Sequence, residues 1–409
     1  MNALLERLLG KATQLTRSGR LQEATAAIQA ALRGGAAAPW HPPAAPTPAA
    51  DRASVDAQII EVEAREVPDA ANDARDEHDA RARARTRTRT RTTPDAAPHN
   101  AAAHASPAPG SGEFIAANYK DAHGQRDYKL YLPPPSADDA PRPLLVMLHG
   151  CTQNPDDFAA GTRANQLARE QGFVVLYPAQ PASANTSGCW NWFKHNHQRR
   201  DAGEPALIVG MARAVMAQHR IDPARVFVAG LSAGGAMAAI LGDAYPDVFA
   251  AVGVHSGLPT GAATDVMTAF SAMRSGSADA SSLPLRGMRA GARPAASPRS
   301  APPTIVFHGD ADATVNVLNG EQVVQACVNA AQVNAGVPAP VEERMSNNGR
   351  SSTRRTWHDS TGRVLAEHWL LAGAGHAWSG GSAEGTYADE RGPDATREML
   401  RFFMAHPRV

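Results

Sequence analysis

Large aromatic side chains are confined to one part of the chain, and this distribution limits where a folded core can form. The 409-residue sequence contains 10 Phe, 6 Tyr and 6 Trp residues, and of these only Trp40 precedes Phe114. A segment so poor in large apolar side chains cannot bury enough surface to offset the entropy lost on ordering. The core is therefore expected to form from about residue 113 onward, which is ample length for one domain.

The sequence ahead of this domain divides into two segments. Residues 1–34 carry Leu, Ala and Ile at helical spacing on either side of Ser18-Gly19, which predicts two short helices. They would dock as a hairpin on the domain or on a second copy, or form an amphipathic element for a hydrophobic surface. Residues 35–112 are rich in Ala, Pro, Asp and Arg and are expected to form a disordered linker. Its alternating Arg residues, Arg81 to Arg91, are typical of a solvated tether or of a contact with an anionic surface.

Charge and cysteine content exclude several classes of protein. Lys plus Arg and Asp plus Glu number 40 each, so the net charge does not favour a nucleic-acid partner. No stretch approaches the ~20 apolar residues of a membrane span, and Glu6 interrupts the apolar run that a secretory signal would need. The cysteines are too few for a disulfide framework and lack metal-ligand spacing; they are Cys151, Cys189 and Cys327. We expect no metal, no cofactor and a cytoplasmic location.

From Phe114 onward, short apolar runs alternate with helical stretches. This pattern predicts an α/β domain over residues 113–409, with a mostly parallel central sheet flanked by helices. The expected strands are residues 128–132, 144–148, 174–177, 226–229, 251–254, 304–307 and 364–370. The expected helices are residues 157–170, 205–218, 234–244, 319–330 and 394–405. Residues 271–300, rich in Ser, Ala, Gly and Arg, are expected to form a surface excursion.

A G-x-S-x-G pentapeptide, residues 230–234, lies between an apolar run and a helix of small residues. A serine in such a tight strand-to-helix turn exposes its hydroxyl above the sheet, and the flanking glycines relieve the crowding. The helix N-terminus also favours developing negative charge. The context predicts that Ser232 is a nucleophile and not a plain turn serine.

Two other strand ends supply an acid and a base. The loop after residues 304–307 contains Asp310 and Asp312, and Asp312 is preferred as the orienting acid because it lies deeper in the loop while Asp310 can cap the turn. His376 lies in a glycine-rich loop after the last strand and is free to reach the serine. The order Ser232, Asp312, His376 is that of α/β-hydrolases. The strand residue His255, by contrast, is expected to be structural, as are His308 and His368.

Two backbone N–H groups are expected to stabilise an oxyanion. One belongs to Ala233, next to the nucleophile, and the other to Cys151, in the loop after residues 144–148. Cys151 would serve through its backbone while its side chain is simply a small buried group. The sequence does not show whether Cys151 and Cys189 are bonded.

Three tryptophans are candidates for substrate binding. Trp190 and Trp192 stand in one short aromatic string, and Trp378 lies beside His376. They would line a groove for an apolar substrate chain that offers few hydrogen bonds. The alternative is that the string forms a loop cover packed on the domain.

Several strings in order resemble the polyhydroxybutyrate depolymerase family of esterases: HGCTQ (149–153), GCWNWF (188–193), GEP (203–205), GLSAGGAM (230–237), VHSG (254–257) and FHGD (307–310). The resemblance implies an α/β-hydrolase that cleaves short-chain poly(3-hydroxyalkanoate) esters through an acyl-enzyme. It also implies that Ser232, Asp312 and His376 form the triad and that Cys151 belongs to the oxyanion hole.

Three functional hypotheses remain at this stage. The first is a serine esterase acting on poly(3-hydroxybutyrate) or its oligomers, with the polymer granule surface as partner. The second is a feruloyl or acetyl-xylan type carbohydrate esterase, because related esterases act on those groups. The third is a non-catalytic granule-binding protein. With no secretory signal recognised and 33 residues after His376, the chain resembles the intracellular variant that carries a secreted-type catalytic domain.

Overall fold

The computed structural model describes residues 112–135, 140–277, 301–331 and 339–408. The predicted N-terminal helices, nearly all of the predicted linker and residues 278–300 of the predicted excursion lie outside this part. The proposed division of the chain at residues 34 and 112 therefore stays a prediction.

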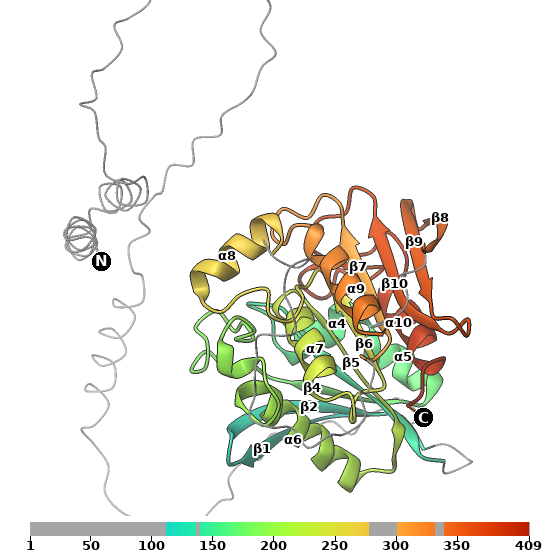
Figure 1. The fold of residues 1–409 in the computed structure, drawn as a ribbon. Coiled ribbons are helices and arrows are strands. Elements are labelled where there is room, and N and C mark those ends of the chain that lie inside the picture. The colour runs from blue at the N-terminus through green and yellow to red at the C-terminus, as the bar shows by residue number, and fades with distance from the viewer. Residues whose placement is uncertain (1–111, 136–139, 278–300, 332–338, 409) are drawn as a thin grey trace, which may run out of the picture. The chain divides into compact units, whose positions relative to one another are not determined.

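A ten-stranded sheet with the order β1-β2-β4-β3-β5-β6-β7-β10-β9-β8 forms the centre of the described domain (Figure 1). Strands β3 to β7 and β10 pair in parallel, whereas β1, β2, β8 and β9 add antiparallel pairs at the two edges. The strands are β1 (Glu113–Asp121), β2 (Gly124–Leu132), β3 (Arg142–Leu148), β4 (Val174–Pro178), β5 (Ile221–Leu231), β6 (Ala251–His255), β7 (Thr304–Gly309), β8 (Val341–Asn347), β9 (Arg350–His358) and β10 (Val364–Leu371). A separate short pair joins β11 (Trp378–Ser379) and β12 (Ala388–Asp389).

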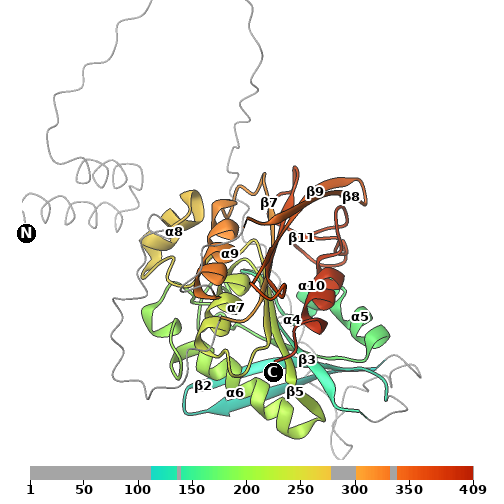
Figure 2. The same ribbon diagram turned by 45° about the vertical axis from the view of Figure 1, so that its right-hand side comes forward.

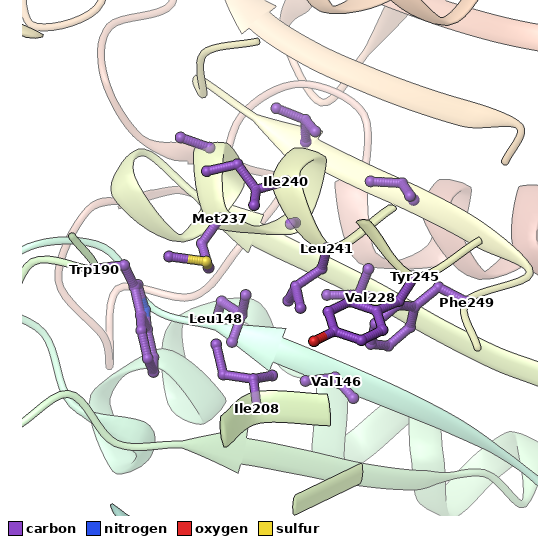
Figure 3. Close-up of a cluster of buried hydrophobic side chains, with 14 of the residues drawn as sticks. Val146, Leu148, Trp190, Ile208, Val228, Met237, Ile240, Leu241, Tyr245 and Phe249 are labelled. Atoms are coloured by element: carbon purple, nitrogen blue, oxygen red, sulfur yellow. The ribbon is translucent and has the colours of Figure 1, made fainter. Parts of the chain in front are cut away.

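Helices cover both faces of the sheet. They are α4 (Pro155–Thr162), α5 (Ala164–Gln171), α6 (Gly203–Gln218), α7 (Ala233–Ala244), α8 (Val266–Ser275), α9 (Leu318–Ala331) and α10 (Ala395–Met404), with a 3-10 turn η1 (His195–His197). Residues of α6, α7 and α9 belong to one buried apolar cluster, in which Ile208 and Leu241 face Val146 and Val228 of the sheet (Figure 3). Residues of α4, α5 and α10 belong to a second cluster, in which Phe227 stacks on Phe403 at 5.0 Å.

The predicted fold class is confirmed, because the central sheet is mostly parallel and lies between helices. Each of the seven predicted strands lies within an observed strand. The strands of the central sheet that were not predicted, β1, β8 and β9, lie at its two ends, and the edge strand β8 is exposed along nearly its whole length. The short pair of β11 and β12 was not predicted either. An edge strand without a buried face has no apolar run or alternation to reveal it.

Two local predictions were wrong. The expected helix over residues 157–170 is two helices, because Arg163 adopts a left-handed conformation with φ of 53° between α4 and α5. The expected excursion over residues 271–300 begins inside α8, which starts after Asp265. The Asp265 side chain accepts the Thr268 N–H, and the Thr268 hydroxyl accepts the Asp265 N–H, which completes a capping box. Such reciprocal bonds stabilise the start of a helix.

Candidate active site

Ser232 occupies the turn between β5 and α7, with φ of 58° and ψ of −119°. This left-handed conformation is rare for a residue with a side chain and is held by its surroundings. A Cβ at Gly234 would overlap the carbonyl oxygen of Leu148, so the helix can approach the sheet this closely only where that residue is glycine. The structure therefore forms the strained turn that the pentapeptide predicted.

Asp312 and His376 meet because their strands are neighbours. β7 and β10 run in parallel, and their carboxyl-end loops carry the two residues. His376 Nδ1 lies 2.7 Å from Asp312 Oδ2, while Asp312 Oδ1 accepts the N–H groups of Thr314 and Val315 at 2.9 Å each. Asp310 instead accepts the Gly373 N–H at 2.7 Å, outside this pair.

The Asp312 carboxyl remains ionised in this setting. Burial would raise its pKa, but the hydrogen bonds from His376 and from the Val315 N–H outweigh burial, and the pKa is lowered. An ionised carboxylate places the imidazole proton on Nδ1 and leaves Nε2 of His376 as an acceptor. This is the protonation state that a general base facing a serine requires.

His255 connects the serine turn to the histidine loop. Its carbonyl accepts the Ser232 N–H at 2.9 Å, and its ring Nε2 accepts the Ser379 N–H at 3.0 Å. Burial lowers its pKa to about 3, assisted by the nearby His308 and His376, so the ring is a neutral acceptor. Within the described residues no hydrogen bond joins the Ser232 hydroxyl to His376. His255 is thus a structural residue whose contacts align the two loops.

The loop after β3 lies against the nucleophile. A Cβ added to Gly150 would lie 3.6 Å from the Cβ of Ser232, which places Cys151 beside the serine. In the described part of the chain, neither the Cys151 N–H nor the Ala233 N–H has a hydrogen-bond partner. Both N–H groups that were predicted to stabilise the oxyanion are therefore free to donate hydrogen bonds to it.

A disulfide joins Cys151 to Cys189, with a Cα–Cα distance of 4.2 Å, and answers the question that the sequence left open. Two hydrogen bonds reinforce it: the Thr152 N–H donates to the Ser187 carbonyl at 2.8 Å, and Trp190 Nε1 donates to the His149 carbonyl at 3.1 Å. The segment 187–190 therefore braces the oxyanion loop. The remaining cysteine, Cys327, is a buried free thiol.

The prediction that three tryptophans line a substrate groove was wrong. Trp190, Trp192 and Trp378 are 0%, 5% and 1% exposed. Figure 3 shows Trp190 in the same buried cluster as Met237. Trp378 stacks on His255 at 5.1 Å and donates from Nε1 to Thr396 at 3.0 Å. The alternative reading, a loop packed on the domain, describes Trp190 and Trp192, because both rings lie in the core cluster, where they remove a large apolar surface from water.

A buried carboxylate that sequence reasoning did not single out holds the tryptophan loop. Glu204 Oε1 accepts Gln180 Nε2 at 2.6 Å and Asn191 Nδ2 at 2.7 Å, and Oε2 accepts the Asn191 N–H at 2.8 Å. Burial would raise the pKa of Glu204, but hydrogen bonds from His197, Asn191 and Gln180 lower it. The only signal in the sequence was the GEP string, which entered through the family resemblance.

Tyr387 is a second residue that the sequence did not reveal. Its side chain is 47% exposed, and its ring centroid lies 6.3 Å from that of His376. Tyr387 lies in a loop, so no helical or strand periodicity in the sequence marks it. Its carbonyl accepts the Trp378 N–H. Tyr387 is the exposed aromatic next to the base.

The described residues show neither a metal-binding cluster nor a membrane-spanning helix. They contain no group of three or more His, Cys, Asp or Glu arranged to hold a metal ion. Among them there is also no helix long and apolar enough to cross a membrane.

The strained serine above a parallel sheet, with the acid and base in the loops of neighbouring strands, defines an α/β-hydrolase. A solved acetyl xylan esterase from Aspergillus awamori shares this fold, with a TM-score of 0.52 and 19% identity over 71% of this chain and 99% of that chain. The family described as esterase PHB depolymerase matches residues 126–343, more than half of the sequence, and the chain belongs to that family.

Curated relatives include both polyester and carbohydrate esterases. The poly(3-hydroxyalkanoate) depolymerase C of Paucimonas lemoignei is 32% identical over 59% of this chain and 56% of the relative. A poly(3-hydroxybutyrate) depolymerase of Ralstonia pickettii is 33% identical over 32% of this chain and 28% of the relative. A probable acetylxylan esterase A of Aspergillus flavus is 27% identical over 61% of this chain and 79% of the relative. The chain thus spans about half or less of the length of the two depolymerases.

Proposed function

We propose that the protein is a serine esterase that hydrolyses ester bonds of poly(3-hydroxybutyrate) or its oligomers. The observation that supports this proposal most directly is the hydrogen bond between Asp312 and His376. It lies at the carboxyl end of the parallel strands, where Ser232 also lies. A strained serine that shares the carboxyl end of the sheet with an oriented imidazole is suited to acyl transfer. Membership of the esterase family supports an ester as the substrate.

Each residue has a defined role in the proposed reaction. The Ser232 hydroxyl attacks the ester carbonyl, and Nε2 of His376 takes its proton and then donates it to the leaving alkoxide. The N–H groups of Cys151 and Ala233 stabilise the oxyanion. Asp312 keeps the imidazole oriented and stabilises its charged form. Water, activated by His376, then hydrolyses the acyl-enzyme and releases the acid.

The substrate class rests on the relatives and is open to a direct test. A depolymerase is among the most similar relatives, which favours the polyester, while the acetylxylan esterase covering 61% of this chain supports a carbohydrate ester as the second candidate. Product analysis should compare hydroxybutyrate polymer and oligomers with feruloyl and acetyl-xylan esters. Faster cleavage of the hydroxybutyrate esters is expected, and faster cleavage of the carbohydrate esters would promote the second candidate.

The Ser232→Ala variant separates an esterase from a non-catalytic granule-binding protein. Hydrolysis should be lost while granule binding persists, because the substitution removes one oxygen from a residue that is only 8% exposed. Ser275→Ala, on the exposed end of α8, is the matched control and should hydrolyse like the unchanged protein. Full hydrolysis by Ser232→Ala would remove Ser232 from the mechanism.

The place of action stays a prediction. The sequence favoured the cytoplasm with granule association, whereas the Cys151–Cys189 disulfide is of a kind that persists mainly in oxidising compartments. Thiol trapping of the protein taken directly from its own cells, together with fractionation, distinguishes the two. A reduced pair in the soluble or granule fraction supports the cytoplasmic proposal, and an oxidised pair outside the cytoplasm contradicts it.

A further inference from the structure

Helix α8 turns three of its four large apolar side chains toward solvent, while the fourth, Met273, is half-buried against the core. Val266, Met267 and Phe270 are 52%, 75% and 59% exposed, while the residues that the helix buries are Ala269 and Ala272. A surface helix of an α/β domain ordinarily buries its large apolar side chains. This inverted pattern leaves an apolar face that nothing covers within the described residues, and contiguous faces of this kind mark sites of interaction.

Leu318, at the start of α9, adds an exposed apolar side chain beside the end of α8. It is 44% exposed, and its Cβ would lie 3.2 Å from a Cβ placed on Gly276, at the end of α8. Figures 1 and 2 both show α8 beside α9. We call Val266, Met267, Phe270 and Leu318 the α8 surface.

Hydrogen bonds tie α8 to the loop that carries the catalytic acid. The Met273 carbonyl accepts the Asn316 N–H at 2.7 Å, and the Arg274 carbonyl accepts Asn316 Nδ2 at 3.1 Å. The Ala272 carbonyl accepts Asn319 Nδ2 at 2.9 Å. Asn316 is four residues beyond Asp312, so the α8 surface is held at the same edge of the sheet as the acid–base pair.

The charge around the α8 surface limits what can dock there. Arg274 is the one basic residue of α8. Asp265, directly before the first residue of the helix, caps it by accepting the Thr268 N–H at 2.8 Å. A helix that lies on an anionic membrane carries a polar face rich in Lys and Arg, which α8 lacks. An uncharged, methyl-bearing polyester chain matches this surface in both polarity and charge.

We propose that the α8 surface adsorbs the solid polyester and holds it at the edge of the sheet where Ser232 cleaves. This inference rests on the proposed function, since it names the form of the substrate that the same site receives. Soluble esters reach Ser232 without this surface. Adsorption and chemistry are therefore separable.

The test compares two double variants of the full chain. Met267→Ser with Phe270→Ser removes the most exposed part of the α8 surface. Ile115→Ser with Val341→Ser is the matched control, because those side chains are 39% and 54% exposed on the edge strands β1 and β8. Binding to amorphous poly(3-hydroxybutyrate) granules is measured in the Ser232→Ala background, and hydrolysis of soluble hydroxybutyrate oligomers with Ser232 intact.

The α8 variant should bind granules about tenfold or more weakly, because two large apolar side chains no longer lose contact with water on adsorption. The control should bind as before, and both should keep kcat/KM for soluble oligomers. Unchanged granule binding, equal loss in the control, or a parallel fall in oligomer hydrolysis would each overturn the proposal. So would a dimer that the α8 variant converts to a monomer, because a second copy would then cover the surface. Failure of the unchanged protein to cleave either the granules or the oligomers would instead overturn the proposed function, whatever the granule binding.

Discussion

Removing the Cys151–Cys189 bridge is expected to lower stability far more than turnover. The bridge joins residues 38 positions apart. Constraining a loop of that length in the unfolded chain stabilises the native state by about 4 kcal/mol in the chain-entropy description. The free energy of unfolding of domains of this kind is about 5–15 kcal/mol. The double variant Cys151→Ala with Cys189→Ala should therefore remain folded but denature at a lower urea concentration.

Turnover should survive because other contacts hold the oxyanion loop. The Gly150 N–H donates to Gln153 Oε1 at 2.9 Å, and the bonds from Thr152 to Ser187 and from Trp190 to His149 do not involve sulfur. The loss of kcat should therefore stay well below the ~10²–10³ that a missing oxyanion donor typically costs.

Urea denaturation and kcat on a soluble butyrate ester, each with and without reductant, check both expectations. Cys327→Ala is the control, because it removes a buried thiol that is not bridged. Reductant should lower the urea midpoint of the unchanged protein and of Cys327→Ala but not that of the double variant. A loss of kcat as large as 10²-fold would refute the reasoning, since the bridge itself would then position the Cys151 N–H.

Asp312→Asn should lower kcat by about 10⁴-fold, the typical effect of an amide in place of the triad carboxylate, whereas Asp310→Asn should keep most activity; equal losses in steady-state assays would contradict the assignment. Buried His255 and His368 have pKa values lowered by burial to about 3, against about 6.5 in an unfolded chain. The unfolded state therefore takes up protons first as the pH falls, and the free energy of unfolding should drop by about 2 kcal/mol per histidine between pH 7 and about pH 5. In urea titrations, the free energy of unfolding of His368→Leu should depend less steeply on pH than that of the unchanged protein. An unchanged slope would show that His368 does not contribute to the pH dependence. Tyr387→Ser should raise KM for hydroxybutyrate oligomers about threefold to tenfold with little change in kcat. The expected reason is that the exposed ring beside His376 contributes apolar contact with the substrate and takes no part in proton transfer. A fall in kcat alone would instead assign Tyr387 to positioning His376.

Local chemistry made much of the fold predictable. The buried parallel strands are continuous apolar runs because both of their faces are covered, and such runs are visible in sequence. The turn at Ser232 was equally visible, since Gly234 must be glycine where the chain passes the Leu148 carbonyl. The order of Ser232, Asp312 and His376 followed from the strand ends, because the carboxyl ends of parallel strands share one edge.

What depends on contacts between distant segments was decided only by the tertiary structure. The sequence favoured Asp312 over Asp310 as the acid, but only the structure shows the contacts: Asp310 accepts the Gly373 N–H and Asp312 bonds to His376. The burial of Trp190 depends on its fit against α7 and on the carbonyl of His149, 41 positions away.

The disulfide and the outward-facing apolar side chains of α8 were also decided only by the tertiary structure. Cys151 and Cys189 bond because two loops meet at one edge of the sheet, which no local pattern encodes. Helix α8 exposes Phe270 because Asn316 and Asn319 hold it with its alanines inward. Periodicity places apolar side chains on one side of a helix, but the partners that hold the helix decide whether that side faces the core or the solvent.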